Sequence, residues 1–158
     1  MAIEERWPKI DVCAIPASDG GEGFTEVVKP HIEGEWIECI TQNPLGKPIK
    51  SSFIWAEKTQ LAIIEMAEAS GLTLIDAEEA NPWKTSTYGT GILIRTALDL
   101  GAKQLLITLG GSATNDGGAG ALMALGAKLL DENGMAIPYG CEGLTHLNTI
   151  NLADLHPR

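Results

Sequence analysis

The segment Gly110–Gly118 constrains the fold of this 158-residue chain more than any other part of its sequence. It follows the apolar run Gln104–Leu109, which predicts a buried strand, and it precedes residues 119–125, which predict a short helix. A glycine-rich loop in this position is typical of an anion-binding site, because successive backbone N–H groups point into it and the helix N-terminus carries partial positive charge. The competing interpretation is a tight turn whose glycines allow close packing.

The residues of this loop favour phosphate chemistry without matching a standard nucleotide motif. The sequence lacks the Gly-Lys-Ser/Thr of a Walker A loop and the third glycine of a dinucleotide fingerprint. Asp116 is informative, because a carboxylate about 4 Å from a phosphate charge costs on the order of 4 kcal/mol at an effective dielectric of about 20. In a phosphate-binding loop, Asp116 would therefore face a magnesium ion or a hydroxyl nucleophile. A solvated turn aspartate is the alternative.

Two further clusters place glycines beside hydroxyl or carboxylate groups ahead of a helix. Ser18–Gly23 is here called the first cluster and Ser86–Gly91 the third cluster, with the Gly110–Gly118 loop counted as the second. The segment Ser18–Gly23 has Asp19 and Glu22 three residues apart, and two oxygen ligands from one turn would suit a hard cation. Capping of the next helix by these acidic residues is the alternative. The segment Ser86–Gly91 is either a second anion-binding end or a capped helix start with Thr90 as the N-cap.

The rest of the pattern predicts a mixed α/β fold. Strands are expected at residues 9–15, 35–41, 49–55, 61–66 and 104–109, and a hairpin at 127–130 and 135–137. The runs from 35 to 66 read as an antiparallel meander. Helical segments are expected at 25–29, at 67–70 and around Leu93, Ala97 and Leu100, the last ended by Gly101. The order helix, strand, helix in the second half predicts parallel pairing with crossover helices.

Composition excludes several classes of partner. Eleven Lys and Arg against 21 Asp and Glu give a net charge of −10, which repels nucleic acid and anionic membranes. No apolar run approaches the roughly 20 residues of a membrane span, and the N-terminal residues do not resemble a secretory signal. The cysteines Cys13, Cys39 and Cys141 lack metal or disulfide spacing, so we expect buried or idle thiols in a reducing cytoplasm. The three histidines are scattered and predict no metal site.

Taken together, several segments in order resemble the bacterial, type-1 glycerate kinase family. They are Pro16–Gly23, Ile64–Leu72, Asn81–Pro82, Ser86–Gly91 and Gly110–Gly118. The resemblance implies a two-lobed α/β enzyme that phosphorylates a hydroxyl group of D-glycerate with ATP and magnesium, its site lying in the cleft. It implies that residues 1–34 are the remnant of an N-terminal Rossmann-like lobe and that 35–158 form part of a glycerate kinase-like α/β lobe.

The resemblance also suggests roles for individual residues. Asp116 and Asp19 are the expected catalytic groups, and Glu22 and Asp116 the expected metal ligands. Substrate or phosphate contacts are expected from Gly20, Gly21, Gly23, Ser86, Tyr88, Gly89, Thr90, Gly91, Gly110, Gly111, Ser112, Asn115 and Gly117.

Family members are more than twice as long, and here Phe24 and Ser18 stand where Thr and Ala are usual. We therefore expect an internal portion of such a kinase. The alternatives are a catalytically incomplete anion- or nucleotide-binding module and an assembly partner of a separately encoded kinase half. Missing strands would leave open sheet edges, so a homo-oligomer is also expected.

Overall fold

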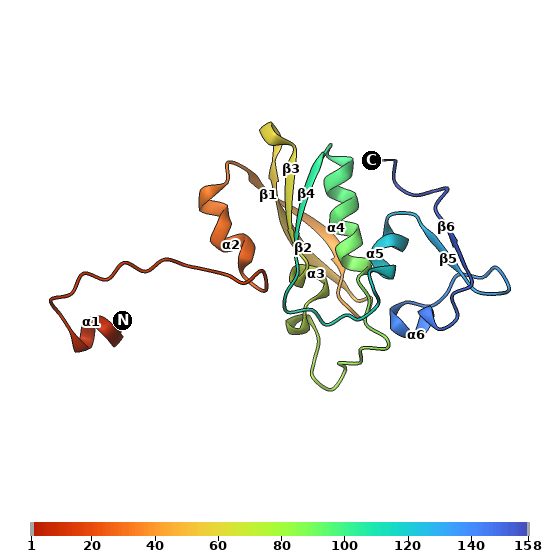
Figure 1. The fold of residues 1–158 in the computed structure, drawn as a ribbon, viewed down its shortest axis with the longest axis horizontal. Helices are drawn as coiled ribbons and strands as arrows, with labels where there is room; N and C mark the ends of the chain where they lie inside the picture. The colour runs from red at the N-terminus through yellow and green to blue at the C-terminus, as the bar shows by residue number, and fades with distance from the viewer. Residues whose placement is uncertain (1, 158) are drawn as a thin grey trace.

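The computed structural model describes residues 2–157, and its elements follow one another as helices, strands and short 3₁₀ turns (Figure 1). In chain order they are α1 (Ala2–Arg6), α2 (Phe24–Val28), η1 (Lys29–His31), β1 (Glu35–Gln42), β2 (Pro48–Ala56), η2 (Glu57–Thr59), β3 (Leu61–Glu65), α3 (Ala67–Ser70), η3 (Leu72–Leu74), α4 (Tyr88–Asp99), β4 (Gln104–Thr108), α5 (Ala119–Ala124), β5 (Lys128–Leu130), α6 (Gly140–Leu144) and β6 (Thr149–Asn151). Within these residues, no helix combines the length and hydrophobicity needed to cross a lipid bilayer.

A four-stranded mixed sheet in the order β1-β2-β3-β4 organises the molecule. The pairs β1–β2 and β2–β3 are antiparallel, which confirms the predicted meander. The pair β3–β4 is parallel, with Ile63 opposite Leu106, and its crossover runs through α3, η3 and α4. The predicted mixed α/β class with parallel pairing in the second half is therefore confirmed.

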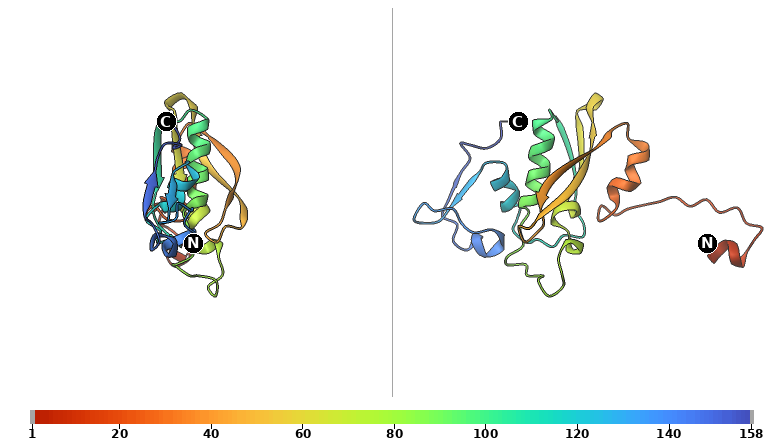
Figure 2. Two further views of the ribbon diagram at one scale, coloured as in Figure 1. Left: turned by 90° about the vertical axis from the view of Figure 1, so that its right-hand side faces the viewer. Right: turned by 180° about the vertical axis from the view of Figure 1, so that it is seen from behind.

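Helix α4 covers one face of this sheet and forms the main core with it (Figure 2). Phe53, Ala62 and Ile64 from the sheet pack against Leu93 and Ala97 from the helix, and all five side chains are fully buried. Neighbouring strand residues alternate between the two faces, so this set reflects the period-2 pattern of β2 and β3. A second, smaller core lies beyond α5, where Ala119, Ala127, Leu129 and Ile137 meet.

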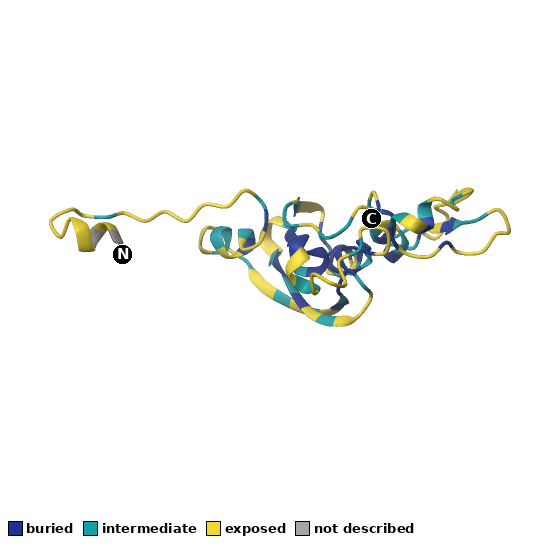
Figure 3. Cartoon of the chain, turned by 90° about the horizontal axis from the view of Figure 1, so that it is seen from below, coloured by how far each residue is buried: buried dark blue, intermediate teal, exposed yellow. Residues whose placement is uncertain are grey.

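The strand predicted at residues 9–15 is wrong. Residues 11–18 form no secondary structure and run along an exposed arm that joins α1 to the body of the molecule (Figures 1 and 3). Ile15 on this arm is 82% exposed. A strand needs a neighbour to pair with its backbone N–H and C=O groups, and within residues 2–157 the structure pairs no strand with this segment.

Two details of the prediction for α4 are also wrong. The helix begins at Tyr88 with Thr87 at the N-cap, and Thr90 lies inside its first turn. The Thr90 hydroxyl is instead buried, 2.7 Å from the Ser70 hydroxyl, and so joins α4 to α3. Leu100 is 47% exposed and does not share the buried face of Leu93. The predicted glycine end is confirmed, since Gly101 has φ +100°.

The C-terminal third is a small unit around the two-stranded sheet β5–β6. The predicted turn at 131–134 is present, with the Met135 carbonyl accepting from the Asp131 N–H at 2.8 Å. Residues 135–137 add only an isolated bridge, Leu130 with Ala136, so the predicted hairpin is shorter than expected. The main partner of β5 is β6 from the C-terminal segment, where the sequence pattern was weak.

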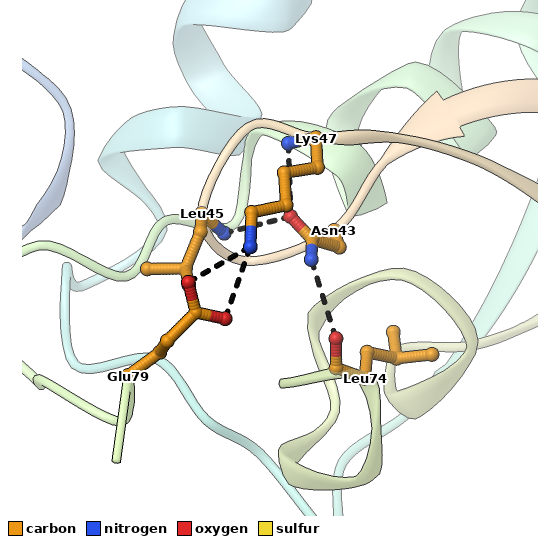
Figure 4. A network of polar contacts seen from close by, with 5 residues as sticks. All are labelled: Asn43, Leu45, Lys47, Leu74 and Glu79. Atoms are coloured by element: carbon orange, nitrogen blue, oxygen red, sulfur yellow. Dashed lines mark hydrogen bonds and ion pairs between the residues drawn. The ribbon is translucent and has the colours of Figure 1, made fainter. Parts of the chain in front are cut away.

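The turn between β1 and β2 anchors the loop that leads into α4 (Figure 4). The Asn43 side-chain oxygen Oδ1 accepts from the N–H groups of Leu45 and Lys47, and its side-chain nitrogen Nδ2 donates to the Leu74 carbonyl. Lys47 also pairs with Glu79 at 2.8 Å. The Ser86 N–H donates to the Pro44 carbonyl at 2.9 Å. The turn therefore fixes the segment that carries the third cluster.

The three cysteines are free in the structure; Cys13 is exposed, and Cys39 and Cys141 are partly buried. Burial raises the pKa of the Cys39 thiol above its ordinary value. A raised pKa keeps this thiol protonated and unreactive at neutral pH.

Candidate functional site

The loop Gly110–Gly118 lies at the carboxyl end of β4 and contacts both other predicted clusters. On one side, Gly110 packs against Gly21 in the first cluster. On the other side, Asp116 accepts a hydrogen bond from the Thr87 N–H, at 2.9 Å. Three glycine-rich segments that are far apart in the sequence therefore meet at one end of the parallel strand pair. In α/β sheets this end is where ligands bind.

The contact between Gly110 and Gly21 requires glycine at position 110. A Cβ atom built on Gly110 would lie 2.5 Å from the Gly21 Cα and 2.6 Å from the Gly21 nitrogen. Gly111 has φ +61°, and a Cβ there would meet the carboxylate of Glu22. Close packing, one of the two interpretations of this loop, therefore explains the first glycine pair.

Asp116 is the most heavily bonded side chain of the site and is only 1% exposed. Its carboxylate accepts from the N–H groups of Gly118 and Gly120, each at 3.1 Å. It also accepts from the Thr87 N–H and hydroxyl and from the Ser86 hydroxyl, at 2.9 to 3.3 Å. The interpretation of Asp116 as a solvated turn residue is therefore wrong.

These hydrogen bonds use the N–H groups at the start of α5 that were expected to bind an external anion. Asp116 accepts from the Gly118 and Gly120 N–H groups, and the Thr87 hydroxyl accepts from the Ala121 N–H at 3.0 Å. The negative charge at this helix end is thus the chain's own carboxylate, and binding of an external anion by the loop stays a prediction. The roles predicted for Asp116 in metal binding and catalysis stay predictions, because its acceptor sites contact protein groups in this conformation.

The rest of the loop keeps unused donors. Among residues 2–157, no protein group accepts from the backbone N–H groups of Gly110, Gly111, Ser112, Asn115 and Gly117. Gly117 adds a left-handed turn, with φ +60°. Successive unpaired N–H groups of this kind form an anion-binding nest.

A cavity of about 420 Å³ opens beneath this loop, between β4, α4 and α5. Its floor is apolar, with Met66, Ile94 and Ile107, and its loop side is polar, with Thr114 and Asn115. The Ser112 and Thr114 hydroxyls lie 3.0 Å apart, so one supports the other at the rim. An apolar pocket with a few polar groups at its mouth suits a small organic ligand.

Glu65, which was not predicted as a site residue, anchors the end of the first cluster by hydrogen bonds. Glu65 is 1% exposed and accepts from the Gly23 N–H at 2.9 Å and from the N–H and hydroxyl of Thr25 at 3.0 and 2.9 Å. It therefore fixes the start of α2 to the end of β3. The sequence did carry a signal for this role, because Glu65 ends the apolar run Leu61–Glu65. A carboxylate at the end of a buried strand is expected to be hydrogen-bonded, since charged residues are buried only when they have partners.

We expect Glu65→Gln to lower the free energy of unfolding by about 2 kcal/mol. The amide can replace one carboxylate oxygen as an acceptor but turns an NH₂ group toward the donors of Gly23 or Thr25. Chemical denaturation would measure the change, with Glu33→Gln as the control, since Glu33 and its partner Lys58 are both exposed. A loss no larger than that of the control would show that the Glu65 contacts add nothing to stability.

Glu68 lies in α3, three residues after Glu65 at the end of β3, and its side chain is partly buried. Burial raises its pKa, and the nearby carboxylates of Glu65 and Glu26 raise it further. Because its pKa is raised, Glu68 favours the protonated form in the folded state. Its contribution to the free energy of unfolding is therefore fully present below the ordinary pKa of glutamate and is lost as the pH rises through the folded-state pKa.

We therefore expect Glu68→Gln to raise the melting temperature at pH 7 and to have little effect below the ordinary glutamate pKa. Thermal unfolding followed across this pH range would measure the difference. Glu78→Gln, at an exposed position, is the control. An increase that persists unchanged at acidic pH would contradict the electrostatic cause.

In the first cluster, Asp19 and Glu22 are exposed and do not share a ligand geometry with a third group. The Asp19 carboxylate accepts from the Gly21 N–H at 3.0 Å, which closes a local turn, and Glu22 lies against Gly111. Within residues 2–157, no group of three or more histidine, cysteine, aspartate or glutamate side chains is arranged to hold a metal.

The third cluster serves mainly to build the start of α4. The Tyr88 N–H donates to the Ser86 hydroxyl at 3.2 Å, and the Tyr88 ring packs on Tyr139 with centroids 4.9 Å apart. The Gly89 carbonyl accepts from the Thr41 hydroxyl, and Gly91 lets α5 approach, since its Cβ would lie 2.6 Å from the Ala121 backbone. These contacts hold the start of α4 in place, although the N-cap residue Thr87 makes no side-chain cap hydrogen bond, and substrate contacts from this cluster stay a prediction.

Comparison with known proteins adds independent information. The model of the glycerate kinase family matches residues 1–158. The glycerate kinase of Haemophilus influenzae is 44% identical over 152 residues, which are 96% of this chain and 40% of that protein. The glycerate 2-kinase of Escherichia coli is 44% identical over 156 residues, 99% of this chain and 41% of that protein.

A crystal structure from Salmonella typhimurium LT2, described as a glycerate kinase 2, superimposes with a TM-score of 0.86 at 41% identity. The match covers 98% of this chain and 42% of that one. The chain thus spans about two fifths of the length of the relatives it matches.

Proposed function

Because this chain belongs to the glycerate kinase family, we propose that it contributes to ATP-dependent phosphoryl transfer to a hydroxyl group of D-glycerate, giving phosphoglycerate. The observation that carries the proposal is the meeting of the three glycine-rich segments at the carboxyl end of β4. Gly110 packs against Gly21, and the Asp116 carboxylate accepts a hydrogen bond from the Thr87 N–H. The activity proposed is that of the complete glycerate kinase fold, to which this chain supplies these loops.

The transfer forms a bond between the attacking hydroxyl oxygen and the γ-phosphorus and breaks the bond to the β–γ bridging oxygen, which leaves with ADP. Such a reaction depends mainly on positioning and on stabilisation of charge on the transferred group. We assign these tasks to the unpaired N–H groups of Gly110, Gly111, Ser112, Asn115 and Gly117. The cavity below them, with Thr114 at its rim, suits the carbon chain of a small acid.

We propose a separate role for each of the three carboxylates near the loop. Asp19 is the proposed acceptor of the hydroxyl proton, because it is exposed and only one of its oxygens bonds within the chain. Glu22 is the proposed protein ligand of magnesium, because its exposed carboxylate lies at Gly111, where nucleotide phosphates would supply the other ligands. When bound, the ion would neutralise phosphate charge. Asp116 acts as a positioning residue that holds the second and third segments together.

A coupled assay with ATP and D-glycerate tests the proposal. The chain is assayed alone and after co-expression with the remaining portion of Escherichia coli glycerate 2-kinase. We expect product from the co-expressed pair, and Asp19→Asn should abolish turnover while ATP still raises the melting temperature. Ligand-induced stabilisation without product in either sample would favour the non-catalytic binding module instead, and turnover that survives Asp19→Asn would remove Asp19 from the mechanism.

A further inference from the structure

Thr85 is a buried residue immediately before the third cluster, and its hydroxyl reaches the middle of the Gly110–Gly118 loop. Its side chain is 0% exposed, and the hydroxyl donates to the Ala113 carbonyl at 2.7 Å. This is the usual length of a well-formed O–H···O hydrogen bond. The Thr85 N–H donates in turn to the Asn81 carbonyl at 3.1 Å, so the backbone of the residue is itself held in place.

The same part of the loop is also held by the end of α3. Backbone hydrogen bonds of 2.9 and 2.8 Å join Ala113 and Gly111 to residues 70–72. Between these two bonds lies the isolated antiparallel bridge of Ser112 with Gly71. In an antiparallel pair, a residue between two such bonds turns its own N–H and C=O away from the partner segment. The Ser112 N–H is therefore directed away from residues 70–72.

The Thr85 hydroxyl fixes the orientation of the peptide unit between Ala113 and Thr114. Because a peptide unit is planar and trans, its C=O and N–H point in opposite directions. The carbonyl faces Thr85, so the Thr114 N–H points the other way, where it donates to the Ser112 hydroxyl at 3.2 Å. A flipped peptide would place a carbonyl oxygen on the Ser112 side of the loop, and its partial negative charge would repel a phosphate.

We propose that Thr85 is a positioning residue of the phosphate-binding loop, because its hydroxyl keeps the Ala113 carbonyl turned away from the N–H groups that bind phosphate. The inference rests on the proposed function, in which the unpaired N–H groups of this loop bind phosphate. Thr85 acts only through the peptide that follows Ala113. A threonine that served the fold alone would change stability without changing affinity, and this difference makes the two roles separable.

Titration of the chain with ATP and magnesium, followed by NMR, tests the inference on two variants. Thr85→Val keeps the shape of the side chain and removes the hydroxyl, whereas Thr85→Ser keeps the hydroxyl. We expect Thr85→Val to raise the Kd for ATP at least about 10-fold and Thr85→Ser to keep it within about 2-fold. In the absence of ATP, the Thr114 amide signal should shift in Thr85→Val and stay nearly unchanged in Thr85→Ser.

Thr41→Val is the matched control for loss of a buried hydroxyl. The Thr41 side chain is 1% exposed, and its hydroxyl also donates to a backbone carbonyl, that of Gly89, at 2.7 Å. Thr41→Val should lower the midpoint of chemical denaturation about as much as Thr85→Val does, yet keep the Kd for ATP within about 2-fold. If Thr85→Val is unfolded, Thr85→Cys provides the comparison with Thr85→Ser, because a thiol is a weak donor.

The possible failures are distinguishable. An affinity that Thr85→Val leaves unchanged, or that Thr41→Val weakens equally, would overturn the inference and leave the proposed function intact. A loss in Thr85→Ser as large as that in Thr85→Val would also overturn it, since serine keeps the hydroxyl. If the loop amides of the unmodified chain do not respond to ATP and magnesium, the proposed function fails and the inference fails with it.

Discussion

Replacing Asp116 with asparagine is expected to lower the free energy of unfolding by about 3 kcal/mol and to weaken ATP binding at the same time. The carboxylate is buried and accepts from donors on two loops, those of Thr87, Gly118 and Gly120 among them. An amide would turn two hydrogens toward groups that are themselves donors. The third cluster would then separate from the loop, and the cavity beneath it would lose its shape.

Chemical denaturation and ATP titration together measure this effect. Asp76→Asn, at an exposed position, is the control and should change neither quantity. A variant that is as stable as the unmodified chain but inactive would return Asp116 to a direct catalytic role, and would contradict the positioning role that its contacts favour.

Gly110→Ala is expected to separate the first cluster from the loop and to lower stability by about 2 to 3 kcal/mol. The new methyl group would lie 2.5 Å from the Gly21 Cα, and a backbone atom cannot move aside as the end of a flexible side chain can. Because Asp19 and Glu22 belong to the displaced segment, we also expect ATP-dependent turnover of the co-expressed pair to fall below detection.

Gly21→Ala is the matched control for this steric argument. A Cβ at Gly21 would meet the flexible Asp19 carboxylate at 3.3 Å and the Gly110 carbonyl carbon at 3.6 Å, which are distances that small shifts accommodate. Although Gly21 is buried, we expect a change of less than about 1 kcal/mol, because neither contact forces a backbone shift. Equal losses at both positions would show that the contact between the two loops is not the cause.

The sequence was sufficient where local pattern and tertiary structure agree. The strand-like runs at 35–41, 49–55 and 61–66 predicted the meander, and Gly101 marked the end of α4. The segment at residues 9–15 has apolar residues at alternate positions, but no strand within residues 2–157 pairs with it, so pattern alone gave the wrong structure.

The polar interior was harder to predict, because hydrogen-bond partners come from distant parts of the chain. Asp116 bonds to Thr87, 29 residues away, and Glu65 bonds to Thr25, 40 residues away. Spacing therefore identified Asp116 but suggested an outward role for an inward-facing group, and it missed Glu65. Thr90 was predicted as a cap for the same reason, since its partner Ser70 lies on another helix.

The most direct test of the central claim is an NMR titration of the chain with ATP and magnesium. The claim is that the unpaired N–H groups of the Gly110–Gly118 loop bind phosphate. We expect the amide signals of Gly110, Gly111 and Ser112 to shift, while those of Ala113 and Gly120, which already donate to Ser70 and Asp116, stay nearly unchanged. Shifts of equal size across the loop, or shifts confined to other parts of the chain, would contradict it.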